Sequence, residues 1–112
     1  MKKEILEILE NCKGSKNAIK VSEIIKKLSM DVKDSQVRAA IRDLVIEDKK
    51  LIGSSKKGFF IIQNATELYT TIGNLSSRKI EIEKRINSLL DSWSKRKEEK
   101  RRIYNDKKNS DM

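Results

Sequence analysis

A long heptad repeat constrains the fold of this 112-residue chain more than any other feature. Side chains on one helical stripe recur at alternating intervals of four and three residues, and a single lysine interrupts an otherwise apolar series: Leu68, Ile72, Leu75, Lys79, Ile82, Ile86, Leu89 and Trp93. This spacing is that of an a/d coiled-coil seam. The chain contains no proline, which permits a long helix without a break. The pattern therefore predicts one long helix with an apolar stripe.

The predicted helix begins at Asn64, because Asn64 and Glu67 have the spacing of a capping box, and it extends to about residue 105. A helix this polar gains little stability unless its seam is buried, so the pattern implies a partner. A second copy of the chain is the simplest one, whereas folding back is disfavoured because the seam exceeds the width of a small domain. We expect a homodimer through Leu68, Ile72, Leu75, Ile82, Ile86, Leu89 and Trp93. Lys79 at an a position would weaken the coil and help to fix its register or partner.

Two further features of the C-terminal half lead to predictions. Gly73-Asn74 indicates a hinge or a helix break, and we expect residues 106–112 to form a disordered basic and polar tail. A run of cations precedes and enters this tail, which we interpret as a solvated helix end, with a nucleic-acid backbone contact as the alternative. These cations are Lys95, Arg96, Lys97, Lys100, Arg101, Arg102, Lys107 and Lys108.

Residues 1–63 contain three shorter apolar stripes at helical spacing. The first runs from Ile5 to Cys12 and ends at a Lys-Gly-Ser sequence. After a short extended stretch at residues 19–21, a second helix is predicted with Ser22 as its N-cap, and a third with Asp34 or Ser35. We expect the third helix to bury Val37, Ala40, Ile41, Leu44 and Val45.

The stretch "LIGSSKKGFFII", residues 51–62, allows two interpretations. Gly53 and Gly58 are five apart, as in the first part of a phosphate-binding loop, but Phe59 and Phe60 stand where that motif needs Lys and then Ser or Thr. The apolar flanks instead favour a β-hairpin with Lys56 and Lys57 at its tip. Strand alternation predicts that one phenylalanine ring faces the helices and the other the opposite face.

The order helix, short extended segment, helix, turn, helix and basic hairpin resembles the winged helix-turn-helix superfamily. Its most specific part is "DSQVRAAIRDL" followed closely by "LIGSSKKGFFII". The chain is similar to small bacterial or bacteriophage DNA-binding proteins with a C-terminal helical tail. The resemblance implies a mainly α fold with a small β-hairpin wing: a winged helix-turn-helix domain over residues 1–63, followed by a long helix over residues 64–105.

The resemblance also implies a DNA-binding surface, because the third helix of a winged helix usually enters the major groove. It places near DNA the residues Ser35, Gln36, Arg38, Ala39 and Arg42. Gln can bond bidentately to adenine and Arg to guanine, while Ala permits close approach or meets a thymine methyl. The hairpin tip would contact phosphates through Ser54, Ser55, Lys56 and Lys57. The alternative for both sets is an ordinary exposed helix face and turn.

A net charge of +9 favours an anionic partner. We expect a dimeric winged-helix protein that binds double-stranded DNA, by sequence or by backbone, as a transcriptional regulator or DNA-replication accessory. The alternative is a protein–protein interaction module, such as a phage-encoded inhibitor of a host nucleic-acid machine.

We expect no enzymatic activity, cofactor or metal site. The chain has no histidine, and its single cysteine, Cys12, lies on an apolar stripe, as expected of a reduced core thiol. No carboxylate cluster or metal-ligand spacing stands out. No signal peptide or membrane span is visible, because Glu4, Glu7 and Glu10 interrupt the apolar residues near Met1. We therefore expect a cytoplasmic protein without a membrane partner.

Overall fold

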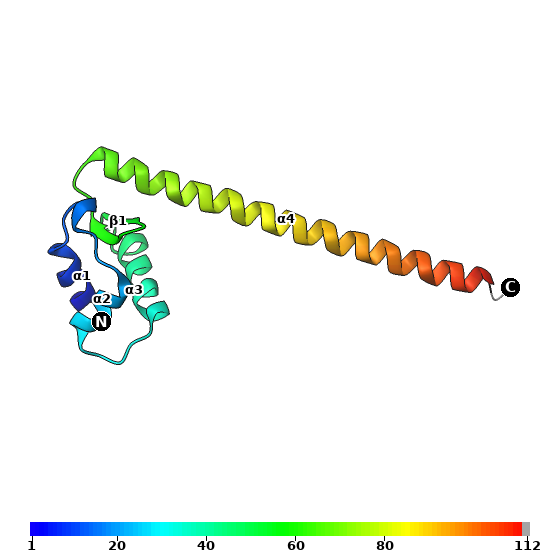
Figure 1. Ribbon diagram of the computed structural model, residues 1–112, viewed down its shortest axis with the longest axis horizontal. Helices are drawn as coiled ribbons and strands as arrows, with labels where there is room; N and C mark the ends of the chain where they lie inside the picture. Colours follow the sequence, from blue (N-terminus) through cyan, green and yellow to red (C-terminus); the bar gives the residue numbers. More distant parts are fainter. Residues whose placement is uncertain (111–112) are drawn as a thin grey trace. The chain divides into compact units, whose positions relative to one another are not determined.

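The computed structural model describes the backbone of residues 1–110 and the side chains of residues 1–102. The chain is mainly helical, with one two-stranded antiparallel hairpin and a long C-terminal helix, as the sequence predicts (Figure 1). It divides into two compact units, an N-terminal unit of Met1–Gly73 and a C-terminal unit of Asn74–Met112. The first turns of the long helix thus belong to the N-terminal unit.

Three α-helices build the core of the N-terminal unit. They are α1 (Lys2–Glu10), α2 (Val21–Leu28) and α3 (Asp34–Ile46), with a short 3-10 helix, η1 (Ser15–Asn17), between the first two. The stripes that the sequence predicts meet in a core of ten buried residues: Ile5, Leu9, Ile19, Val21, Ile24, Val37, Ala40, Ile41, Leu44 and Ile52. Cys12 is half-buried against this core, and its thiol donates to the carbonyl oxygen of Ile8 at 3.5 Å.

The prediction of a buried Val45 is wrong, because 38% of this residue is exposed. In the last turn of α3 the core position is filled by Leu44, which is 2% exposed. Val45 and Ile46 instead face outward, and the exposed Leu51 follows them just before the hairpin.

The hairpin consists of β1 (Ile52–Ser55) and β2 (Gly58–Ile61), paired in register from Ile52 with Ile61 to Ser55 with Gly58. The other edge of β2 is bonded by the chain between α1 and α2. Ile19 and Phe59 exchange two backbone hydrogen bonds of 2.8 Å, and Gly14 donates to Ile61 at 2.9 Å. The extended stretch predicted at residues 19–21 is therefore shorter than expected: Ile19 forms one antiparallel bridge with β2, whereas Val21 already begins α2.

The two phenylalanines of β2 lie on opposite faces of the hairpin. Phe59 packs against the helical core. Phe60 is 2% exposed and lies over Gly53, where the hydroxyl of Thr71 from the long helix also approaches. The hairpin is thus covered on one face by α1 to α3 and on the other by the first turns of the long helix.

Both α2 and α3 have a lysine as N-cap and begin earlier than the sequence predicts. The N-cap of α2 is Lys20 and not Ser22, and the N-cap of α3 is Lys33 and not Asp34 or Ser35. Burial of Val21, which is 4% exposed, draws the start of α2 forward. At α3 the Oε1 atom of Gln36 accepts the backbone N–H of Lys33 at 2.8 Å, which supplies the cap from inside the helix.

The long helix α4 (Ala65–Ser110) passes through Gly73 and Asn74 without interruption. The predicted helix break is therefore wrong, while the hinge alternative stays a prediction. The helix also continues past the expected end near residue 105 into the predicted disordered tail. Residues 111 and 112 lie outside the described residues, as do the side chains from residue 103 onward.

Replacing Gly73 with Ala is expected to stabilise α4 by about 0.5–1 kcal/mol. Glycine in a helix interior loses more conformational freedom on folding than alanine, and a Cβ added at Gly73 would meet nothing within 4 Å. Thermal unfolding followed by circular dichroism at 222 nm would measure the gain. A lower melting temperature for Gly73→Ala would contradict this expectation. It would mean that position 73 needs a backbone conformation that alanine disfavours.

Candidate functional site

The five predicted DNA-contacting residues of α3 lie on one face of that helix. Ser35, Gln36, Arg38 and Arg42 are exposed, and Ala39 is half-buried. The opposite face carries Val37, Ala40, Ile41 and Leu44 into the core. Packing of the apolar stripe therefore fixes which side of α3 is presented to solvent, and the predicted set lies on that side.

Arg38 links the outward face of α3 to the hairpin. Its Nε atom pairs with Oδ1 of Asp34 one turn earlier, and its guanidinium carbon lies 5.8 Å from the ring centroid of Phe59. Both members of the ion pair are more than half exposed, so the pair contributes little to stability. Arg42 takes part in none of the ion pairs found among the described side chains, which leaves its guanidinium available for a ligand.

Gln36 is exposed but already partly engaged, because its Oε1 atom caps α3. Bidentate recognition of adenine needs both the oxygen and the nitrogen of the amide. The Nε2 group is free of this bond, whereas adenine readout by Gln36 would share the second lone pair of Oε1 with the cap.

The hairpin tip is a two-residue turn formed by Lys56 and Lys57, both exposed. Of the two serines predicted to assist them, Ser54 is half-buried and Ser55 is exposed. The Oγ atom of Ser55 accepts the backbone N–H of Lys57 at 3.2 Å and so shapes the turn. Gly53 and Gly58 lie within the paired strands, where they cannot wrap a phosphate as a loop.

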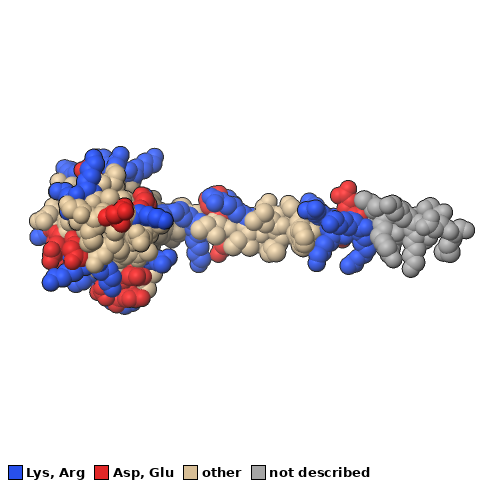
Figure 2. All heavy atoms as spheres, turned by 90° about the horizontal axis from the view of Figure 1, so that it is seen from below, with Lys and Arg blue, Asp and Glu red and all other residues tan. Residues whose placement is uncertain are grey.

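Acidic side chains are interspersed with the basic ones over the N-terminal unit (Figure 2). Asp34 stands on α3 beside the predicted contact residues, and Asp43 is half-buried in its later turns. Close to a phosphate backbone such carboxylates would reduce affinity. In the C-terminal unit, Figure 2 shows Lys and Arg side chains gathered toward the end of the described part of the helix. The described cations of this stretch are Lys95, Arg96, Lys97, Lys100, Arg101 and Arg102.

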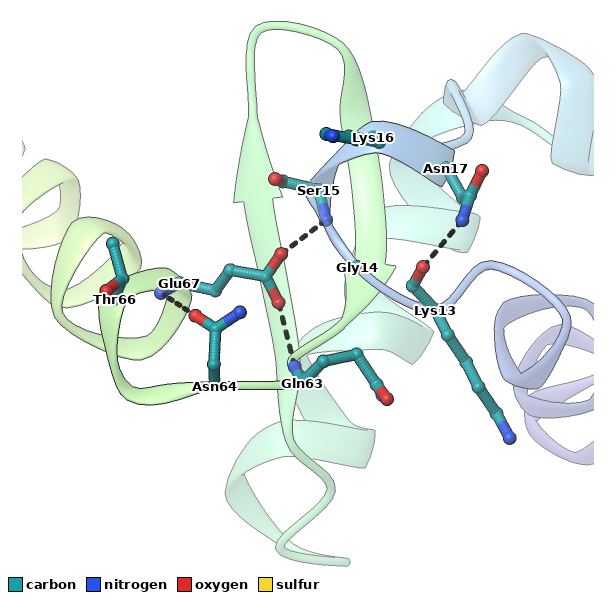
Figure 3. A pocket seen from close by; sticks show the side chains of 9 residues that line it. All are labelled: Lys13, Gly14, Ser15, Lys16, Asn17, Gln63, Asn64, Thr66 and Glu67. Atoms are coloured by element: carbon teal, nitrogen blue, oxygen red, sulfur yellow. Dashed lines mark hydrogen bonds between the residues drawn. The ribbon is translucent and has the colours of Figure 1, made fainter.

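A shallow hollow beside the start of α4 is held together by Glu67 (Figure 3). One carboxylate oxygen accepts the backbone N–H of Ser15 at 2.7 Å, and the other accepts that of Gln63 at 2.8 Å. Glu67 in turn donates its own N–H to Oδ1 of Asn64 at 2.9 Å. The capping interaction predicted for Asn64 is present. The side chain of Glu67, however, accepts the backbone N–H groups of Gln63 and of Ser15 in η1 in place of that of Asn64. Sequence reasoning missed Ser15, which lies 52 positions away.

The two backbone N–H groups lower the pKa of Glu67, with that of Ser15 as the largest cause. A carboxyl whose pKa is lower in the folded state stabilises the fold at pH values above its ordinary pKa of about 4.3, and this stabilisation is lost as pH falls through the lowered value. Glu67 therefore bridges α4 and the residues around η1, and we expect its protonation at low pH to weaken these two hydrogen bonds.

Glu67→Gln is expected to lower the melting temperature at pH 7 and to flatten its decline between pH 7 and pH 3. An amide presents one acceptor oxygen in place of two and does not titrate, so it cannot reproduce both bonds. Melting curves of the wild type and the variant across this range would measure the difference. Glu10→Gln is the matched control, since Glu10 is exposed and makes no side-chain hydrogen bond among the described residues. Parallel pH profiles for the wild type and Glu67→Gln would contradict the expectation.

The apolar stripe of α4 is largely uncovered. Exposure lies between 45% and 71% for Ile72, Leu75, Ile82, Ile86, Leu89 and Trp93. Leu68 is half-buried, because it belongs to the first turns that cover the hairpin. The guanidinium carbon of Arg96 and the Nζ atom of Lys97 each lie 5.9 Å from the ring centroid of Trp93. The apolar stripe therefore ends at Trp93, where cationic side chains begin. These six residues form a stripe, interrupted by Lys79, that is exposed among the described residues.

No family model matches the chain, and no curated protein or solved structure is significantly similar to it. Among the described residues, no helix combines the length and apolar character needed to cross a membrane. Those residues also contain no group of three or more His, Cys, Asp or Glu side chains placed to hold a metal ion. A functional assignment therefore has to come from the geometry of α3, the hairpin and α4.

Proposed function

We propose that this chain is a dimeric winged-helix protein that binds double-stranded DNA, with α3 in the major groove and the hairpin as its wing. In this role it serves as a transcriptional regulator or a DNA-replication accessory in the cytoplasm. The observation that carries the proposal is the contact of Arg38 with Phe59, because it brings the outward face of α3 next to the hairpin that has Lys56 and Lys57 at its tip.

The chemistry of this surface suits DNA. Arg42 is exposed at the centre of the α3 face, where a guanidinium can bond bidentately to guanine. Lys56 and Lys57 stand at the hairpin tip as mobile point charges that suit phosphates. The half-buried Ala39 leaves room for α3 to approach the bases. The net charge of +9 adds long-range attraction to the DNA polyanion.

Fluorescence anisotropy with random and selected duplexes at several salt concentrations would test the proposal. Two phosphate-contacting cations per protomer, Lys56 and Lys57, lead us to expect log affinity to fall with log salt with a slope of about −2 per protomer. Tighter binding to a selected duplex would indicate sequence reading, and equal binding to all duplexes a backbone role. Absence of binding even at low salt would reject DNA as the ligand.

A second candidate function is protein–protein interaction, for example a phage-encoded inhibitor that docks on a host nucleic-acid machine. The observation that favours it is the run of exposed apolar side chains Val45, Ile46 and Leu51, which are 38%, 58% and 60% exposed. Function that survives Arg38→Ala and Arg42→Ala but is lost with Ile46→Asp would support this candidate over DNA binding.

A further inference from the structure

We infer that the seam of α4 pairs with the same seam of a second copy of this chain as a parallel, two-stranded coiled coil in register. The inference rests on the dimer in the proposed function and adds its strand number and direction. The surface concerned consists of Ile72, Leu75, Lys79, Ile82, Ile86, Leu89 and Trp93, which carries the exposed stripe described above.

The residue types at the two seam positions favour two parallel strands. The spacing assigns Ile72, Lys79, Ile86 and Trp93 to position a, and it assigns Leu68, Leu75, Ile82 and Leu89 to position d. In parallel coiled coils, β-branched residues at a combined with Leu at d select dimers, because the two layers orient their side chains differently. Ile72 and Ile86 supply the first feature, while Leu75 and Leu89 supply the second.

The charges that flank the seam distinguish the two directions. Arg78 and Arg85 occupy position g, and Glu83 occupies position e. In a parallel pair, a g residue faces the e residue five positions later in the other strand, so Arg78 of each copy meets Glu83 of the other. An antiparallel pair that overlaps the whole seam would instead place Arg78 opposite Arg85, twice. The flanking charges therefore attract in the parallel arrangement and repel in the antiparallel one.

Both groups are available for this contact. Neither Arg78 nor Glu83 joins an ion pair within the described part of the chain, where Glu81 is paired with Lys84 at 3.6 Å. Leu90 at the next e position is 61% exposed and faces Arg85 of the other copy, so it adds apolar cover for the arginine stem.

Lys79 favours two strands over three or four. In a parallel dimer it faces its own counterpart at one a layer, which lowers stability but leaves both ammonium groups able to reach solvent. In a three- or four-stranded bundle the a layer is more enclosed, so a lysine there would lose more hydration. The coil ends after Trp93, because the next two seam positions are Arg96 and Lys100.

Disulfide trapping in the full chain would test strand direction. The single native thiol is first removed by Cys12→Ser, and Leu75→Cys or Leu89→Cys is then added on its own. In a parallel, in-register pair each d residue lies beside its own counterpart, so mild oxidation should convert both variants into covalent dimers. An antiparallel pair would cross-link only in a mixture of the Leu75→Cys and Ile86→Cys variants, and that result would overturn the inference.

Sedimentation equilibrium of the reduced chain would test strand number and the role of the charges. We expect dimers, an approximately tenfold weaker dimer for Arg78→Glu, and recovery in Arg78→Glu/Glu83→Arg, since two exposed ion pairs change sign and are then restored. Monomers, or species larger than dimers, would overturn the inference. Circular dichroism of each variant would verify that α4 is still helical.

The same samples separate this inference from the proposed function. Covalent dimers that bind no DNA in the anisotropy assay would uphold the coiled coil and reject DNA as the ligand. Monomers that bind DNA with the expected salt dependence would reject the coiled coil and retain the DNA ligand.

Discussion

Replacing Gly58 with Ala is expected to lower the free energy of unfolding of the N-terminal unit by about 3 kcal/mol or more. Gly58 opens β2 with φ of +124°, a conformation that costs an L-residue about 1–3 kcal/mol. A Cβ at this position would also overlap the backbone of Ile19 and Lys20. That backbone cannot withdraw without breaking the two 2.8 Å hydrogen bonds between Ile19 and Phe59.

Amide hydrogen exchange would measure this effect where it arises, because far-UV dichroism is dominated by α4. Protection of the Ile19 and Phe59 amides should fall in Gly58→Ala, while the exchange of amides in the C-terminal unit should be unchanged. Gly73→Ala is the matched control, since it adds the same methyl group at a position with open space. Destabilisation of similar size in both variants would mean that steric overlap at Ile19 is not the cause.

Removing both lysines of the hairpin tip is expected to weaken DNA binding on the order of tenfold per protomer and to reduce the salt slope by about two, if the proposed function holds. Lys56 and Lys57 would contact phosphates, which are the same in every sequence, so Lys56→Ala/Lys57→Ala should weaken all duplexes alike. Arg42→Ala should instead lose about 1–3 kcal/mol of discrimination at one base pair. Anisotropy titrations against a selected duplex and its single-base variants would separate the two effects.

The matched control for charge is Lys3→Ala/Lys16→Ala, which removes two exposed lysines from α1 and η1. Its affinity for DNA should stay close to that of the wild type apart from a small uniform loss. Both double variants should unfold like the wild type, because all four lysines are exposed. An equal loss in the two double variants would mean that net charge, and not the hairpin tip, determines binding.

Features with a short-range pattern could be predicted from the sequence. The buried stripes of α1 to α3, the two-residue turn at Lys56 and Lys57 and the exposed heptad stripe of α4 each follow from residue types within a few positions of one another. The outward position of Arg38 and Arg42 follows in the same way, because the buried stripe of α3 determines its free face.

The features that could not be predicted depend on contacts distant in the chain or on competition between signals. Ser22 has the better side chain for an N-cap, but burial of Val21 starts α2 earlier. Asp34 pairs with Arg38 while Gln36 supplies the cap of α3. The hydrogen bond between Glu67 and Ser15 joins residues 52 positions apart, so no local sequence pattern predicts it. At Gly73 the helix-forming neighbours outweigh the glycine.

The close approach of Phe60 to Gly53 has a consequence for the evolution of this chain. The ring occupies the space that any side chain at position 53 would need, and the hydroxyl of Thr71 closes the same space from α4. A mutation to a larger residue at position 53 would therefore be tolerated only after position 60 has become smaller. In descendants of this sequence we expect positions 53 and 60 to change together, with their total side-chain volume preserved. Covariation of the two positions would therefore indicate that the hairpin still packs against α4.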